Sequence, residues 1–213
     1  RRDIEGLEAQ GGGERTHGGV IYRARPATSL AFEERMQEQI DAKKTIGAAA
    51  AAHVEPGMAV YIDGGSTVQY AVSQIVARPL QVVTNSLSVA AHFASDPQVE
   101  LLVLGGMHYP RTGVLVGPIT TQALAQLHAD VMIFSCAALY ENEIFNSSLV
   151  MAEVENLALR QTARKILLMD STKFGRKSLA RVCSTDEVDL IITDAGIPER
   201  WPQLLGERLF IAR

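Results

Sequence analysis

The segment from Val60 to Thr67 constrains the fold of this chain most strongly, because a buried strand, a glycine loop and a helix meet there. Residues 58–62 form a continuous apolar run that is rich in β-branched side chains and follows Pro56-Gly57, which predicts a short buried strand. From Val68 to Val76 the apolar residues recur at helical spacing. The glycines and hydroxyl residues in between predict a tight strand-to-helix loop.

Two interpretations of this loop are open. Glycines let backbone N–H groups approach an anion closely, and the dipole of the following helix favours negative charge at its N-terminus. The loop would then bind a phosphate-bearing small molecule. Alternatively, Ser66 or Thr67 is an ordinary N-cap of a kind common in α/β proteins.

Composition limits the class of protein. The 213 residues, 47% of them hydrophobic, suffice for one globular α/β domain with a small appendage. No apolar run reaches the length of a membrane span, and no segment resembles a signal peptide, so we expect a cytoplasmic protein with no membrane partner. Cys136 and Cys183 lack metal-ligand spacing, and we expect no metal or cofactor. A net charge of −4 argues against a dominant nucleic-acid surface on this chain.

Short apolar runs alternate with helical patterns along most of the chain, which predicts right-handed crossovers and a mostly parallel sheet flanked by helices. The further predicted strands are 80–84, 99–104, 131–136, 165–170, 188–193 and 209–212. The further predicted helices are 32–54, 118–127, 150–163 and one that ends at 94, with a hairpin over 109–116. The first helix is expected to be continuous. Its charged residues are expected to face solvent, and they are Glu33, Glu34, Arg35, Lys43 and Lys44.

Four loops with glycines or small polar residues follow the carboxyl ends of predicted strands. In an open α/β sheet these ends share one edge, where ligands bind near a switch in strand order. Lys173 suits a phosphate, and Asp63 and Asn85 suit sugar hydroxyls, although Lys173 as an exposed lysine and Asn85 as a helix cap remain open. The candidate effector-binding residues are Asp63, Gly64, Gly65, Ser66, Thr67, Thr84, Asn85, Ser86, Gly105, Gly106 and Lys173.

These motifs, in this order and spacing, resemble the effector-sensing part of the DeoR family of bacterial transcription repressors over essentially the whole chain. The motifs that carry the resemblance are Phe32-x-x-Arg35, Lys44 and Ile46 ahead of an alanine-rich helix, Asp63–Thr67, Thr84–Leu87, Leu104–Gly106, Leu115–Pro118, Asp170–Gly175 and Ile192–Gly196. The resemblance implies a phosphosugar-isomerase-like α/β fold, of the ribose-5-phosphate isomerase and CoA-transferase type. It also implies a phosphorylated sugar or similar metabolite as effector, and a DNA-reading head.

The resemblance implies three parts of the chain: a remnant of a winged helix-turn-helix at 1–19, a linker at 20–31 and a sensor domain at 32–213. The opening residues are similar to the end of the recognition helix, and the segment around His17 is similar to the wing. Arg1, Arg2 and His17 are expected to contact DNA in the intact regulator or to be frayed terminal residues in this chain. Because the front of a recognition helix reaches the base edges, we expect no sequence-selective DNA binding by the 213 residues alone.

One stretch departs from the family pattern. Where the family has Gly-Ala-Asp-Gly after the fourth strand, this chain has Ser135–Ala138, so Ala137 takes the place of the aspartate. One polar contact to the effector is therefore missing, and Tyr140, Glu141 and Asn146 are candidates to replace it. Either the ligand differs from a simple sugar phosphate or the pocket is degenerate.

The favoured function is a transcriptional regulator, a repressor of sugar or related carbon metabolism, that binds operator DNA and is not an enzyme. The alternative is a phosphosugar isomerase or deaminase, because a related fold serves both activities. Such an enzyme needs a poised carboxylate or histidine, for which Asp63, Asp170 and His108 are the candidates. No strand precedes a Gly-x-Gly-x-x-Gly motif, which argues against a dehydrogenase.

Self-association is expected through apolar segments near the middle of the chain. Leu115-Val116, Ile119 and Ile144-Phe145 are more hydrophobic than a solvated surface usually is. These residues form an interface of a homo-oligomer or, as the alternative, pack inside the domain.

Overall fold

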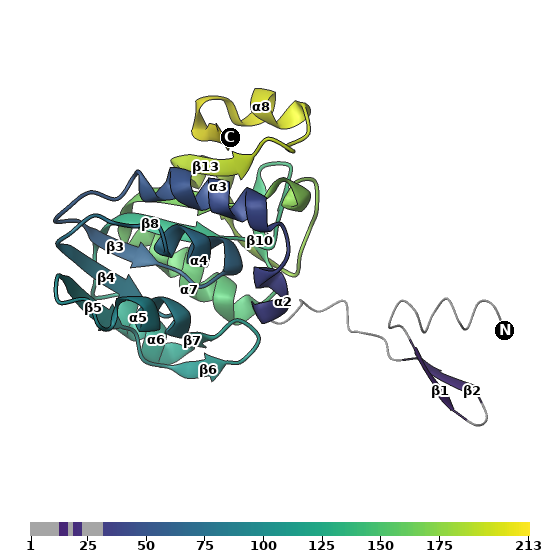
Figure 1. Ribbon diagram of the computed structural model, residues 1–213, viewed down its shortest axis with the longest axis horizontal. Helices are drawn as coiled ribbons and strands as arrows, with labels where there is room; N and C mark the ends of the chain where they lie inside the picture. The colour runs from purple at the N-terminus through teal and green to yellow at the C-terminus, as the bar shows by residue number, and fades with distance from the viewer. Residues whose placement is uncertain (1–12, 17–18, 23–31) are drawn as a thin grey trace. The chain divides into compact units, whose positions relative to one another are not determined.

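The computed structural model describes residues 13–16, 19–22 and 32–213 (Figure 1). The chain divides into two compact units, Arg1–Leu30 and Ala31–Arg213. In the first unit, β1 (Gly13–Thr16) and β2 (Gly19–Tyr22) form an antiparallel hairpin, and β2 covers the start of the predicted linker. Arg1, Arg2 and His17 lie outside the described residues, so their predicted role in DNA binding stays a prediction.

The second unit is built on a seven-stranded sheet whose strands pair in parallel, in the order β14-β13-β11-β8-β3-β4-β5. Its strands are β3 (Ala59–Ile62), β4 (Leu80–Thr84), β5 (Val99–Val103), β8 (Ala129–Ser135), β11 (Thr162–Leu168), β13 (Leu190–Asp194) and β14 (Leu209–Ala212). The predicted α/β class with a mostly parallel sheet is confirmed. From β3 the chain first extends the sheet through β4 and β5, and then returns to the other side of β3 with β8, so the strand order reverses between β3 and β8.

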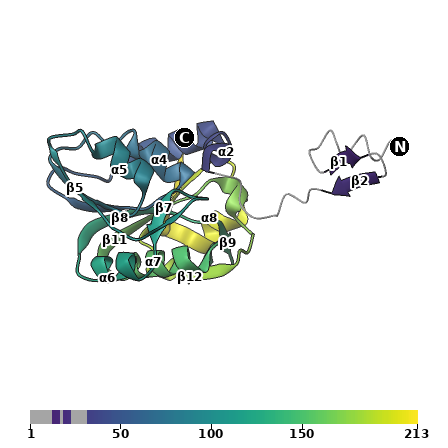
Figure 2. The same cartoon turned by 90° about the horizontal axis from the view of Figure 1, so that it is seen from below.

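Helices cover both faces of this sheet (Figures 1 and 2). One face carries α3 (Ile40–Ala51), α4 (Ser66–Val72) and α5 (Leu87–Phe93), with α2 (Phe32–Met36) packed on α4. The opposite face carries α6 (Pro118–Leu124) and α7 (Leu149–Arg160). Helix α8 (Arg200–Leu205) lies near the C-terminus. Among the described residues, no helix combines the length and the apolar character needed to cross a membrane.

Alternation along β3 decides which helices each side chain faces. Val60 and Ile62 belong to the apolar core under α3 and α4, whereas Tyr61 belongs to the core under α7. The next residue after Ile62 that points to the α7 side is therefore Asp63. The sheet thus directs Asp63 toward α7.

Smaller antiparallel sheets account for elements that the sequence did not predict. β9 (Ala138–Tyr140), β10 (Glu143–Asn146) and β12 (Ala180–Ser184) form a three-stranded sheet in the order β12-β10-β9. Strands this short give no clear periodic signal, which is why they were missed. β6 (Met107–Tyr109) and β7 (Val114–Val116) form the hairpin that was predicted over 109–116.

The prediction of one continuous helix over 32–54 is wrong. Residues 37–39 separate α2 from α3, and Gln39 has a left-handed backbone conformation with a φ of 50°. Apolar residues continue on both sides of this break, so the hydrophobic pattern does not reveal it. The break allows Lys43 of α3 to donate a hydrogen bond to the backbone carbonyl of Arg35 in α2.

The apolar segments that suggested self-association pack mostly inside the domain. Val116, Ile144 and Phe145 are buried in the core, and Leu115 is half-buried. Ile119 is the exception, with 66% of its surface exposed. These segments therefore give little support to an interface, and homo-oligomer formation stays a prediction.

Gly47 marks a close crossing of α3 and α4. A Cβ atom at this position would lie 2.7 Å from the carbonyl carbon of Tyr70 and 2.8 Å from the nitrogen of Ala71. Alanine favours a helix by about 1 kcal/mol over glycine, but the two backbones would have to separate. We expect Gly47→Ala to lower the free energy of unfolding by about 1–3 kcal/mol, as measured by urea denaturation.

The control is Ala48→Gly at the exposed neighbouring position, which should lower the free energy of unfolding by about 1 kcal/mol through helix propensity alone. If Gly47→Ala instead raised stability, propensity would outweigh packing and the close crossing would not constrain this position.

Candidate functional site

The candidate site lies where the strand order of the sheet reverses. Asp63 directly follows β3, and its backbone N–H donates to the carbonyl of Ile133 in β8, at 3.0 Å. Ligands of open parallel sheets bind at the carboxyl ends of strands near such a reversal. The loop at residues 63–67, the strongest candidate from the sequence, therefore occupies the position where this class of fold forms its binding sites.

Both glycines of this loop are required by close packing. A Cβ atom on Gly64 would overlap the side chain of Val114, and one on Gly65 would overlap the hydroxyl of Ser135 at the end of β8. Gly65 is also the N-cap of α4 and provides no side-chain cap, so the suggestion that Ser66 or Thr67 caps this helix is wrong. The first backbone N–H groups of α4 thus lack a side-chain acceptor from the N-cap.

The loop after β4 supports the loop after β3. Thr84 Oγ1 donates to the carbonyl of Ile62 at 2.6 Å and accepts from the N–H of Ser86 at 3.0 Å. Asn85 donates to the carbonyl of Leu115 at 3.0 Å and accepts from the hydroxyl of Tyr61 at 3.2 Å. These polar groups are therefore engaged within the protein.

The helix cap after β4 is Ser86, which accepts from the backbone N–H of Val89, and not Asn85 as the sequence allowed. Further along the sheet, Gly105 and Gly106 pack against α6 and β7. Thr120 donates to the carbonyl of Gly105 at 2.7 Å, and a Cβ atom on Gly106 would overlap the same hydroxyl. Close packing therefore explains Gly106, whereas a Cβ atom on Gly105 would make only an ordinary contact with Ile119, at 3.5 Å.

The turn after β11 carries Lys173 in the short helix η1 (Ser171–Lys173) and is held from two sides. Asp170 accepts from the N–H of Thr172 at 3.2 Å, and its carboxylate lies 3.7 Å from the Lys173 ammonium. Asp194 accepts from the N–H and the hydroxyl of Ser171, at 2.7 and 2.8 Å. These bonds fix the turn, and the Lys173 side chain keeps 22% of its surface exposed.

Lys43 was predicted to face solvent, and this prediction is wrong. Its exposed fraction is 3%. Burial and then the charge of Lys173 lower the pKa of Lys43 to about 8, while Asp170 acts in the opposite direction. The signal was present in the sequence, because Lys43 precedes Ile46 by three positions and Ala50 by seven, which puts it on the buried stripe of α3.

Arg35 adds a third positive group. Its Nε and Nη2 atoms are buried without a hydrogen-bond partner. Burial and then the charge of Arg111 lower the pKa of Arg35. We call Arg35, Lys43 and Lys173 the cation cluster. Buried donors of this kind favour an anion, and guanidinium and ammonium groups are the usual partners of phosphate.

Two buried carboxyl groups form the other part of the site. Asp63 is 2% exposed, its carboxylate accepts from the N–H of Gly64, and its Oδ2 has no partner. Glu155 of α7 is 1% exposed, its Oε1 accepts from Asn146, and its Oε2 has no partner. Burial raises the pKa of Asp63 to about 7, and burial with the charge of Asp63 raises the pKa of Glu155 well above its usual value.

We call Asp63 and Glu155 the carboxyl pair. Glu155 was not among the predicted site residues, because it is a charged residue on a helix with no motif around it. Of the three residues considered as replacements for the missing aspartate, Asn146 is buried and contacts the pair through Glu155. Tyr140 instead has the Lys177 ammonium 4.3 Å from the centre of its ring, and Glu141 is exposed.

The thiol of Cys136 lies near both parts of the candidate site. Burial raises the pKa of its thiol to about 12, and the charges of Lys173, Glu155 and Asp170 all act on it. The thiol therefore lies within electrostatic reach of both the cation cluster and the carboxyl pair, and it is not a reactive thiolate. Cys136 and Cys183 are free and buried, and residues 32–213 contain no group of His, Cys, Asp or Glu arranged to hold a metal ion.

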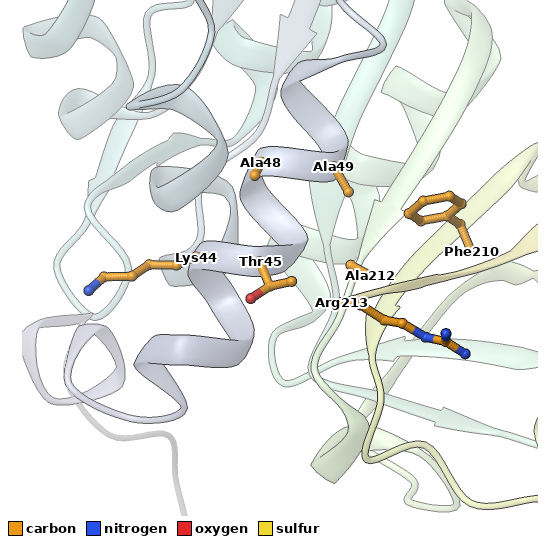
Figure 3. A pocket seen from close by; sticks show the side chains of 7 residues that line it. All are labelled: Lys44, Thr45, Ala48, Ala49, Phe210, Ala212 and Arg213. Carbon is orange, nitrogen blue, oxygen red and sulfur yellow. The ribbon is translucent and has the colours of Figure 1, made fainter.

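A separate hollow of about 460 Å³ lies between α3 and β14 (Figure 3). It is lined by Lys44, Thr45, Ala48, Ala49, Phe210, Ala212 and Arg213. The Lys44 side chain extends away from Phe210 and Arg213, toward solvent. The lining of this hollow shares no residue with the cation cluster or the carboxyl pair.

Comparisons with known proteins identify the family. The family model described as the DeoR C terminal sensor domain matches residues 38–195. The chain is 31% identical to the L-fucose operon activator of Escherichia coli (strain K12) over 197 residues, which are 91% of this chain and 81% of that protein. It is 32% identical to the lactose phosphotransferase system repressor of Streptococcus mutans over 201 residues, covering 91% of this chain and 78% of that repressor.

The chain therefore belongs to the DeoR family of transcriptional regulators, as its motifs predicted. Among solved structures, it is similar to eIF2B delta from Chaetomium thermophilum, with a TM-score of 0.53 and 15% identity over 75% of this chain and 57% of that chain. At this identity the likeness shows the shared α/β fold alone.

The raised pKa of Asp63 predicts a pH-dependent stability. The folded value of about 7 exceeds the unfolded value of about 3.9, so the unfolded chain loses this proton first as the pH rises. The stabilising contribution is complete below about pH 4 and is lost as the pH rises to about 7, at up to roughly 1.4 kcal/mol per pH unit. Asp63→Asn should flatten this dependence, since the amide does not titrate but still accepts from Gly64.

Urea denaturation at about pH 5 and about pH 8 measures the effect. Glu153→Gln, which removes an exposed carboxylate from α7, is the control and should keep the wild-type slope. If Asp63→Asn also kept that slope, Asp63 would not be the group that titrates.

Proposed function

We propose that this chain senses a phosphorylated sugar or similar metabolite on behalf of a DNA-binding transcriptional regulator, a repressor of genes for sugar or related carbon metabolism. The cation cluster carries the proposal. Lys43 is buried within electrostatic reach of Lys173, and Arg35 has buried N–H groups without a partner. The nearby carboxylates of Asp170, Glu38 and Glu33 offset this charge but leave those N–H groups without an acceptor. A phosphate group would supply further negative charge and the missing acceptors.

In the proposed complex, the phosphate lies between the ammonium groups of Lys43 and Lys173. The backbone N–H groups at Gly65–Thr67 provide further donors, because α4 has no side-chain cap there. The hydroxyl of Thr67 is buried without a partner and supports the same placement. The sugar portion then extends toward Asp63 and α7.

Such a ligand would transmit a signal through the elements that it connects. Lys43 and Arg35 belong to α3 and α2, whereas Lys173 belongs to the turn after β11. A shared phosphate would hold these elements together, and α2 is the first described helix after the segment that joins the two units along the chain. We propose that this coupling changes operator binding by a homo-oligomer of the intact regulator.

An isomerase-like enzyme is the alternative function, and one observation favours testing it. A buried carboxyl group whose pKa is raised to about 7, as at Asp63, is in the range of a general base. The relatives are named as regulators, and we propose that this chain binds its ligand without converting it. Isomerised or deaminated product from a panel of phosphorylated sugars would overturn that part of the proposal.

Substitution of the two lysines tests the phosphate site. We expect Lys43→Met and Lys173→Met each to weaken binding of a phosphorylated sugar by about ten- to a hundredfold, because each removes a charge-assisted contact worth about 1.5–3 kcal/mol. Isothermal titration calorimetry against a panel of sugar phosphates, with the unphosphorylated sugars alongside, measures the affinity.

Lys44→Met is the matched control, since Lys44 is the exposed neighbour of Lys43 and should bind the ligand like the wild type. Unchanged affinity in both Lys43→Met and Lys173→Met would place the phosphate elsewhere. Equal binding of phosphorylated and unphosphorylated sugars would reject the phosphate site itself.

A further inference from the structure

The carboxyl pair lies outside the proposed phosphate site. Asp63 follows β3 on the side that faces α7, and Glu155 lies on α7 itself. Asp63 Oδ2 and Glu155 Oε2 are both buried and both lack a hydrogen-bond partner. Two elements thus bring together two acidic groups, each with an acceptor atom that the protein does not use.

Around the pair, the described part of the protein supplies only some of the hydrogen-bond donors, and none of the positive charge, that two buried carboxylates require. Asn146 donates to the other oxygen of Glu155, and the N–H of Gly64 donates to Asp63. The hydroxyl of Tyr61, a donor in the same layer, is directed to Asn85. Within residues 32–213, no lysine, arginine or histidine forms a recorded ion pair with either carboxyl group. Buried acidic groups without a cation are unfavourable, so the site lacks a positive group.

We propose that the effector carries a positively charged amino group at the end opposite its phosphate, and that Asp63 Oδ2 and Glu155 Oε2 bind this ammonium. An ammonium has three donors and a charge, so it satisfies both acceptors and relieves the repulsion between them. A neutral sugar hydroxyl has one donor and does neither. The inference rests on the proposed function, and it names the ligand class as amino sugar phosphates or similar amino phosphates.

The charge distribution of the whole site matches such a ligand. Groups of both signs lie near Cys136, since the charges of Lys173 in the cation cluster and Glu155 in the carboxyl pair both act on that thiol. A molecule with a phosphate at one end and an ammonium at the other carries the charge opposite to each group, negative for the cation cluster and positive for the carboxyl pair. Raised pKa values let the pair hold a proton near neutral pH in the free protein, and an ammonium would displace it.

Matched pairs of ligands test the inference by calorimetry on the full 213-residue chain. The pairs are glucosamine 6-phosphate with glucose 6-phosphate, and galactosamine 6-phosphate with galactose 6-phosphate. We expect the amine to bind about ten- to a hundredfold more tightly than its partner in at least one pair. N-acetylglucosamine 6-phosphate keeps the nitrogen without the charge and should lose the preference. Proton release should accompany binding of the amine, as shown by heats that depend on the buffer.

Glu155→Gln keeps the acceptor for Asn146 but removes the charge, and it should abolish most of the preference for the amine within a matched pair. Glu153→Gln, on the exposed side of α7, should keep the preference. Asp63→Asn is the second variant, should Glu155→Gln fail to fold.

Equal affinity within both pairs, or a preference that persists in a folded Glu155→Gln and Asp63→Asn, would overturn the inference and leave the phosphate site intact. Failure of every sugar phosphate to bind would instead overturn the proposed function, and the inference with it. The loss of affinity in Lys43→Met and Lys173→Met separates these two failures.

Discussion

The reversal of strand order between β3 and β8 is the constraint on which the rest of the structure depends. The chain leaves β3 toward β4 and leaves β8 toward β11, so the two connections run in opposite directions from neighbouring strands. The carboxyl ends of β3 and β8 are therefore available to form a site. Asp63 and Cys136 occupy these ends, and the turn that carries Lys173 follows β11, the next strand along. Side chains from distant parts of the sequence meet there because the topology brings the strand ends together.

The site places charge where the rest of the domain is apolar. Lys43 lies on the stripe of α3 that otherwise packs Ile46 and Ala50 against the sheet, and Glu155 is similarly enclosed on α7. Burying such groups opposes folding, so a large apolar core on both faces of the sheet must offset them. Their opposite pKa shifts have the same physical cause, because burial disfavours the charged form of a lysine and of a carboxyl group alike.

The sequence predicts the parallel sheet well and the charged residues of the site only in part. β4 and β14 have their predicted bounds, because continuous apolar runs between turn residues leave little choice. The loops at Asp63 and Lys173 were found because glycines and small polar residues follow those runs. Lys43 and Glu155 were not, since a charged residue on a helix is assigned to solvent unless its tertiary neighbours are known. The break at Gln39 was missed because apolar residues continue on both sides of it.

The departure at Ala137 acquires a physical meaning from its neighbours. The backbone N–H of Ala137 donates to the carbonyl of Phe145 at 2.9 Å, and the next residue, Asn146, donates to Glu155. The position that lacks the family's aspartate thus adjoins the strand that holds a buried carboxyl group of α7. The acid at Glu155 belongs to the helix layer and lies within electrostatic reach of Asp63, whereas one at Ala137 would follow the end of β8. Under the proposed function, an acid on α7 in place of one at Ala137 would change which end groups an effector can have, while the proposed phosphate contact at Lys173 is kept.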